Sequence, residues 1–236
     1  MTDLFRTGDP SRFAFAARWL QDPDPPERRP ADYGWSWGEL EIVVAGHRVS
    51  ALVTPDGPAS GIRWYLAPLL EWVAEEWDHL LGEQAYTWAE RPDVPAARAV
   101  RDALDRAFAA DERDGDVLER AASDWYARHG LRSAAAGGIV PDLYIRRFGD
   151  GVEISWSGER ASFAPAFLET DCAPGAVRLS REEVADPLRA ILCWAVETVP
   201  SDARAFSHGR ERFVRAVEAT LARAGSDERS TAAFTP

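Results

Sequence analysis

Lysine is absent from this chain, and all 27 basic residues among its 236 are arginines. Schiff-base catalysis, the phosphate-binding P-loop and lysine-assisted nuclease sites each depend on a primary amine, which a guanidinium group cannot replace. The sequence therefore excludes these three kinds of site in their usual form.

Cysteines and long apolar runs are also scarce. Cys172 and Cys193 are too few for a disulfide framework or a structural zinc cluster, and they form no Cys-x-x-Cys pair. No apolar run approaches the roughly 18 residues that a transmembrane helix needs, and the N-terminal residues lack the layout of a signal peptide. We expect a cytoplasmic protein with idle thiols and no membrane contact.

Acidic residues outnumber basic ones by 39 to 27, which gives a formal net charge of −12. A field of this sign repels nucleic acids and anionic membranes unless arginines gather on one face. Gly-x-Gly-x-x-Gly, Gly-x-Ser-x-Gly and His-Glu-x-x-His motifs do not occur in the sequence. The composition predicts a protein partner, disfavours nucleic acid and implies no cofactor.

Turn-forming residues and apolar periodicity divide the chain into three parts. The stretch QDPDPPERRP predicts that residues 1–33 form a proline-rich N-terminal arm, because proline interrupts regular structure. Residues 34–224 are expected to form a single α+β domain. The polar residues 225–236 are expected to form a flexible tail.

Two stretches of alternating apolar and polar residues predict β-hairpins. The first covers residues 38–54 and turns at Ala45–His47. The second turns at Asp150-Gly151, which a type I′ turn favours, and would pair Glu153 with Phe148.

Helical periodicity completes an α+β fold. We expect two β-hairpins in a mixed or antiparallel sheet, with the 64–83 helix and two C-terminal helices packed on one face. Ser180 and Glu183 form a capping-box pattern for the first C-terminal helix, although Asp186-Pro187 could mark a later start. The expected helices cover residues 64–83, 95–112, 116–130, 181–199 and 202–224.

The 64–83 segment combines tryptophans, leucines and carboxylates, and a helical wheel separates them. At 100° per residue its leucines share an arc of about 120° with Trp77, whereas Trp64 and Trp72 lie off that arc. The wheel predicts that Trp77→Ala costs more stability than Trp72→Ala.

The same segment contains an i, i+4, i+8 row of Glu75, His79 and Glu83 that resembles a set of metal ligands. The row extends over about 12 Å of helix, so all three groups cannot reach one ion. At best Glu75 and His79 could serve, and a solvated polar face is favoured.

The order Pro141-Asp142 and then Glu153-Ile154-Ser155 is similar to the Pro-Asp…Glu-x-Lys pattern of metal-dependent nucleases. Ser155 stands where the lysine should be, and the predicted register separates the two carboxylates by roughly 20 Å. A small metal-dependent hydrolase or nuclease using Asp142 and Glu153, with His129 as a further candidate, is therefore the alternative and not the favoured hypothesis.

The second hairpin also supplies a candidate binding face. Tyr144, Arg146 and Phe148 alternate along one strand, with Arg147 beside them, and aromatic and arginine side chains are enriched in binding hot spots. If this face is open, an Arg146→Glu and Tyr144→Ala double variant should stay folded and lose function. The competing interpretation is that the C-terminal helices cover this face.

Three stretches resemble the N-terminal region of bacterial proteins that carry an ImmA/IrrE-type metallopeptidase domain. They are WYLAPLLEWVAEEWDHLL, DWYARHGLRSAAAGGIVPDLYIRRFGDGVEISW and REEVADPLRAILCWAVE, within residues 34–199. The zinc motif of that peptidase is absent, so no catalytic residue is carried over. The resemblance implies a non-enzymatic recognition or adaptor module of a bacterial stress-regulation or anti-phage defence system, with a peptidase or other effector encoded nearby as its partner.

Overall fold

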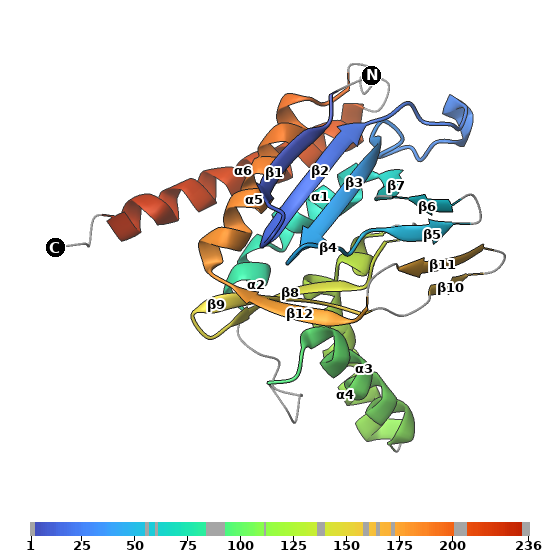
Figure 1. The fold of residues 1–236 in the computed structure, drawn as a ribbon, viewed down its shortest axis with the longest axis vertical. Coiled ribbons are helices and arrows are strands. Elements are labelled where there is room, and N and C mark those ends of the chain that lie inside the picture. Colours follow the sequence, from blue (N-terminus) through green and yellow to red (C-terminus); the bar gives the residue numbers. More distant parts are fainter. Residues whose placement is uncertain are drawn as a thin grey trace.

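A computed structural model describes residues 3–54, 57–59, 61–83, 93–110, 112–135, 140–157, 161–163, 166–170, 173–200 and 207–232. The fold is α+β, as the sequence predicts (Figure 1). All of the strand pairs in the described residues are antiparallel.

A five-stranded sheet forms the upper part of the molecule in Figure 1. Its strands are β1 (Phe5–Asp9), β2 (Phe13–Trp19), β3 (Trp37–Val44), β4 (His47–Arg48) and β7 (Ile62–Tyr65), in the order β1-β2-β3-β4 with β7 also paired to β3. The prediction of an N-terminal arm is therefore wrong over Phe5–Trp19, where β2 lies between β1 and β3. The prolines instead occupy the connection to β3, with the short 3₁₀ helix η1 (Pro26–Arg28).

The first predicted hairpin is shorter than expected. Ala45 and Gly46 both have positive φ angles, 49° and 81°, as a type I′ turn requires. The returning strand β4 ends at Arg48. The chain then enters a second sheet, whose strands run in the order β10 (Ala161–Phe163), β11 (Ala166–Thr170), β5 (Leu52–Thr54) and β6 (Gly57–Ala59).

The second hairpin forms a third sheet with β12 (Gly175–Leu179). Its strands β8 (Leu143–Phe148) and β9 (Gly151–Trp156) are joined at Gly149-Asp150, and Gly149 has a φ of 60°. Glu153 therefore pairs with Arg146, not with Phe148 as predicted. A shift of two residues leaves every side chain on its predicted face of the hairpin, because side chains alternate with a period of two.

Most helices lie close to their expected positions, but the expected 64–83 helix forms two helices that meet at Glu76. The helices are α1 (Leu66–Glu75), α2 (Trp77–Gly82), α3 (Ala96–Ala109), α4 (Glu112–His129), α5 (Arg181–Glu197) and α6 (Ser207–Ala232), with the 3₁₀ helix η2 (Leu131–Ala134) after α4. The capping box of Ser180 and Glu183 is confirmed at the start of α5. Helix α6 continues to Ala232, so the predicted tail of residues 225–236 starts too early.

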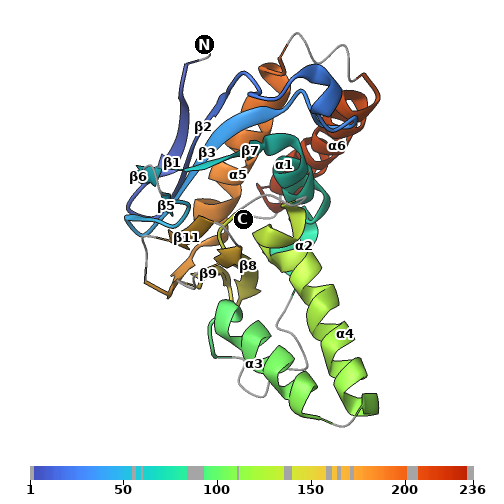
Figure 2. The same cartoon turned by 90° about the vertical axis from the view of Figure 1, so that its right-hand side faces the viewer.

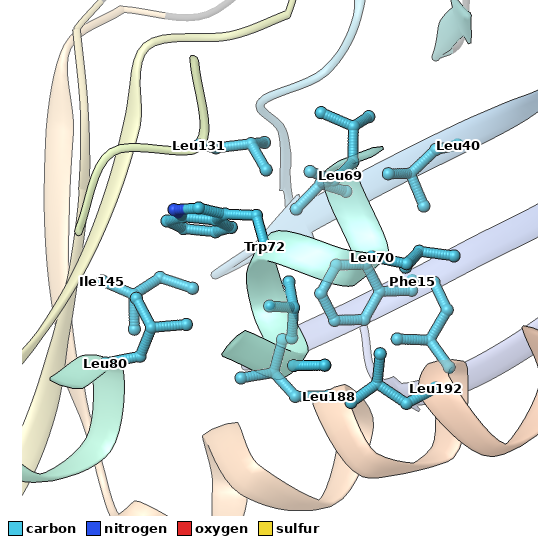
Figure 3. Packing of buried hydrophobic residues seen from close by; sticks show 14 of the residues in the cluster. Phe15, Leu40, Leu69, Leu70, Trp72, Leu80, Leu131, Ile145, Leu188 and Leu192 are labelled. Carbon is cyan, nitrogen blue, oxygen red and sulfur yellow. The ribbon is translucent and has the colours of Figure 1, made fainter. Parts of the chain in front are cut away.

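Helices α1 and α5 cover one face of the five-stranded sheet (Figure 2), and their apolar side chains meet those of the sheet in the main core (Figure 3). Helix α6 packs mainly on α1 and α5, so of the two C-terminal helices it is α5 that covers the sheet face as predicted. No helix within the described ranges is both long enough and apolar enough to span a membrane.

Candidate functional site

The face of the second hairpin that carries the predicted binding residues is covered, as the competing interpretation expected. Tyr144 and Arg146 are only 3% and 1% exposed. The covering elements are α3 and α4 and not the C-terminal helices that the competing interpretation named. Arg147 and Phe148 are half-buried at the end of β8, where the Arg178 guanidinium lies 3.6 Å from the centroid of the Phe148 ring. The four predicted residues do not form one exposed patch.

A buried ion pair explains how the hairpin holds α3. Arg146 donates to both oxygens of Glu153 at 2.9 and 3.0 Å and to the Val94 carbonyl at 2.9 Å. Glu153 also accepts the Ala96 N–H at 2.9 Å, at the first turn of α3. A carboxylate at a helix N-terminus satisfies a free N–H group and interacts favourably with the helix dipole. This side of the hairpin is polar because it anchors a helix.

The alternative metal-dependent site does not assemble around Asp142 and Glu153. The observed register leaves these residues four positions apart along the hairpin, or about 13 Å. Glu153 is committed to Arg146, while Asp142 accepts a hydrogen bond of 2.8 Å from Ser157. No group of three or more potential ligands occurs in the part of the chain that the structure describes.

The weaker metal candidates, Glu75 and His79, also lack a shared site. His79 bonds to Glu83 through Nδ1 at 2.9 Å, one helical turn further along. Glu75 lies at the end of α1, where burial and the Glu71 charge raise the pKa of its carboxyl group. Of the predicted row of Glu75, His79 and Glu83, only the contact between His79 and Glu83 forms.

Glu83 is the centre of a cluster that links α2 to α4. Arg128 donates two hydrogen bonds to its carboxylate at 2.9 and 2.8 Å, and His129 Nε2 lies 3.1 Å from Oε2. These bonds, that of Arg128 above all, lower the pKa of Glu83 to about 2. Burial lowers the pKa of His129, whereas hydrogen bonds to the Ile145 carbonyl and Glu83 oppose that shift. His129 is fully buried and stacks on Trp125 with ring centroids 4.2 Å apart.

Acid should destabilise the protein through Glu83. Folding favours ionised Glu83, so its contribution to stability is present above its ordinary pKa of 4.5 and is lost as the pH falls toward 2. Denaturant unfolding of the wild type and Glu83→Gln should show a smaller loss below pH 4.5 in the variant. The exposed Glu119→Gln is the control, and identical pH profiles for Glu83→Gln and the wild type would contradict the assignment.

The surface that stays open is the outer face of the five-stranded sheet, opposite α1 and α5 (Figures 1 and 2). Residues directly opposite one another in antiparallel strands point to the same side, so three rows of side chains cross this face. The rows are Gly8–Ala14–Val43–Arg48, Arg6–Ala16–Glu41 and Arg18–Glu39–Arg63.

Small residues and charges give this outer face its shape. Ala14 and Ala16 form the floor of a hollow of about 430 Å³ whose lining includes Arg6, Glu41 and Arg48. Arg48 pairs with Glu41 at 2.9 Å. Arg6 is exposed and makes no ion pair within the described residues.

A second charged row lies beside the hollow. Glu39 accepts a bond of 2.8 Å from Arg18 and lies 3.9 Å from Arg63. Across all three rows, four arginines face two glutamates, so the outer face is locally positive on a chain whose net charge is −12.

The alternation that produces this face is visible in the sequence, although residues 1–33 were interpreted as an arm. In FAFAARW the even-numbered residues Ala14, Ala16 and Arg18 are small or charged between larger apolar neighbours. Side chains of β3 alternate in the same way, so Glu39 and Glu41 lie on the face opposite the apolar residues of this strand. This pattern is typical of a sheet with one covered and one open face.

Comparison with known proteins assigns no family: no protein-family model, curated protein or solved structure matches this chain.

Proposed function

We propose that this protein is a non-enzymatic recognition module that binds an acidic segment of a protein partner on the outer face of its five-stranded sheet. The observation that carries the proposal is the gathering of Arg6, Arg18, Arg48 and Arg63 on an open face of an otherwise acidic chain. Arginine is enriched in protein interfaces, where its planar group donates several directed bonds to carboxylates.

The shape of the outer face supports the same occupant. The alanine floor allows an extended backbone to approach the sheet closely, while Arg6 and Arg48 stand at the edge of the hollow. The net charge of −12 opposes the approach of any acidic body over long distances. Binding should therefore depend on short-range pairing and weaken as salt rises.

The cellular role is proposed from the resemblance to the companion region of ImmA/IrrE-type proteins. A cytoplasmic adaptor in a bacterial stress-regulation or anti-phage defence system fits that resemblance, with a peptidase or other effector encoded nearby as the partner. The role of Asp142 and Glu153 as a hydrolase pair is not favoured, because the two carboxylates bind different groups.

Charge reversal on the outer face tests the proposal. In Arg6→Glu/Arg48→Glu the affinity for the purified partner should fall at least tenfold, because the two arginines that border the hollow change sign. The matched control is Arg113→Glu/Arg120→Glu, which makes the same charge change on exposed positions of α4. The partner would be identified by pull-down and mass spectrometry, and its affinity measured by calorimetry with purified proteins at low and high salt.

Three results would contradict this function. The first is a face variant that binds the purified partner as tightly as the control does, and the second is a partner whose contact segment lacks acidic residues. Tight binding of duplex DNA or RNA in place of a protein would assign the face to nucleic acid. The proposed function is supported if the wild type and the control bind the acidic partner and the face variant does not.

A further inference from the structure

A separate cavity of about 410 Å³ lies between α3, α4 and the start of β8. Its volume is within the range of small-molecule sites, which is roughly 300–1,000 Å³. It lies away from the sheet face proposed for the protein partner. It is lined by residues of α3 and α4, by Arg132 of η2, and by Asp142 and Tyr144.

One wall of the cavity is apolar and comes from the two helices. Ala97, Val100 and Leu104 recur along α3, and Ala122 faces them from α4. The same helices contact each other over much of their length. This wall can remove the apolar part of a ligand from water, at roughly 25 cal/mol per Å² of apolar surface buried.

Two groups of opposite charge, Arg132 and Asp142, line the polar part of the cavity without forming an ion pair with each other. The Asp142 carboxylate is held by the Ser157 hydroxyl at 2.8 Å. A carboxylate accepts about four hydrogen bonds, so Asp142 keeps capacity for a ligand donor. Arg132 on η2 lines the same cavity and forms no ion pair with Asp142 or with any other residue in the described ranges.

We propose that this cavity binds a free amino acid with an apolar side chain. The ligand's carboxylate pairs with Arg132, its ammonium group pairs with Asp142, and its side chain lies against Val100 and Leu104. The two ligand charges lie close together at one end of an apolar body, and the cavity combines Arg132 and Asp142 with apolar side chains of α3. Arg101 of α3 also lines the cavity. A ligand with only one of the two charges would leave either Arg132 or Asp142 without its partner.

Tyr126 and Tyr144 line this charged end of the cavity. Burial raises the pKa of both phenols, and the nearby Asp142 carboxylate raises them further. Tyr144 is held under α4 by stacking against Trp125, with ring centroids 6.2 Å apart. The bond from Ser157 holds the Asp142 carboxylate in place, which lowers the entropy cost of binding.

Calorimetry on the full chain would test the ligand class with L-leucine and L-phenylalanine. Two analogues of phenylalanine dissect the charges: phenethylamine lacks the carboxylate, and 3-phenylpropionate lacks the ammonium group. We expect at least one of the two amino acids to bind, and both analogues to bind at least tenfold more weakly than phenylalanine. If neither amino acid binds at millimolar concentration, the proposal is wrong. Equal binding of 3-phenylpropionate would show a simple anion site and would also overturn it.

Variants locate the binding in the cavity. Arg132→Met should weaken the amino acid at least tenfold, whereas Arg120→Met, on the exposed part of α4, should not change its affinity. Asp142→Asn removes the proposed partner of the ammonium group and should also weaken binding at least tenfold. Because Asp142→Asn could disturb the fold through Ser157, Ser157→Ala serves as its control: it removes the same internal bond and should keep the ligand. Amino acid binding that is unchanged in both Arg132→Met and Asp142→Asn would overturn the site.

Discussion

Replacing Arg146 by methionine is expected to lower the free energy of unfolding by about 3–5 kcal/mol. Arg146 and Glu153 are each 1% exposed, and they face each other with two hydrogen bonds. Without the guanidinium group, the Glu153 carboxylate would stay buried with only the Ala96 N–H and the more distant, exposed Arg178 near it. Chemical denaturation of the purified variant would measure the loss.

A second variant separates the cost of leaving the Glu153 charge buried without a partner from the net contribution of the ion pair to stability. In Arg146→Met/Glu153→Leu both charges are removed, so a large part of the lost stability should return. Arg147→Met is the control, because the Arg147 side chain is half-buried and, among the described residues, bonds only to the Gly149 carbonyl. If Arg146→Met stays within about 1 kcal/mol of the wild type, the pair does not hold the fold.

The sequence left two outcomes open for a variant of the same residue. An open face would have allowed Arg146→Glu with Tyr144→Ala to lose function in a folded protein. With both side chains under α3 and α4, the double variant should unfold, since it places a second carboxylate beside Glu153 and removes a buried ring.

Trp72→Ala and Trp77→Ala should each cost about 3–5 kcal/mol of unfolding free energy. The two indoles are similarly buried, at 7% and 4% exposure. Trp72 also donates a hydrogen bond of 2.8 Å to the Ala127 carbonyl of α4. Truncation would leave a cavity at either position and, at Trp72, an unpaired carbonyl. Urea unfolding of both variants would measure these costs.

The helical wheel predicted a smaller cost for Trp72, and the comparison of midpoints decides between the two views. A Trp72→Ala midpoint close to that of the wild type, with a large loss in Trp77→Ala, would restore the wheel assignment. Phe108→Ala is the control for truncation of an aromatic ring, because Phe108 is 82% exposed and should cost less than about 0.5 kcal/mol.

The wheel separates the two tryptophans on the assumption that the segment is covered on one side, whereas α1 is buried on more than one side. Glu71 lies on the side interpreted as polar, yet it is 8% exposed and accepts two bonds from Arg212 of α6, at 2.7 and 3.0 Å. Helix α4 covers the side that carries Trp72. A wheel assumes one covered face, and it contains no information on which other helices pack around the segment.

Where the physical cause is local, the sequence was sufficient. Ser180 and Glu183 determine the start of α5, because the two bonds of a capping box form between residues three positions apart. Alternation along β8 and β9 assigned each side chain to its face even though the register was wrong by two residues. Gly149 and Gly151 both flank Asp150, so composition alone left the position of the turn ambiguous.

Only the tertiary structure decided which faces are open. The polar side of the second hairpin is closed, because Glu153 and Ser155 accept the N–H groups at the start of α3, about 60 residues earlier in the chain. The N-terminal segment is part of a sheet because β2 pairs with β3, which follows the proline-rich connection. Composition determined the acidic, lysine-free character of this protein. The place where its arginines gather depends on strand pairing between distant segments, and no local pattern encodes which distant partner a strand or helix will meet.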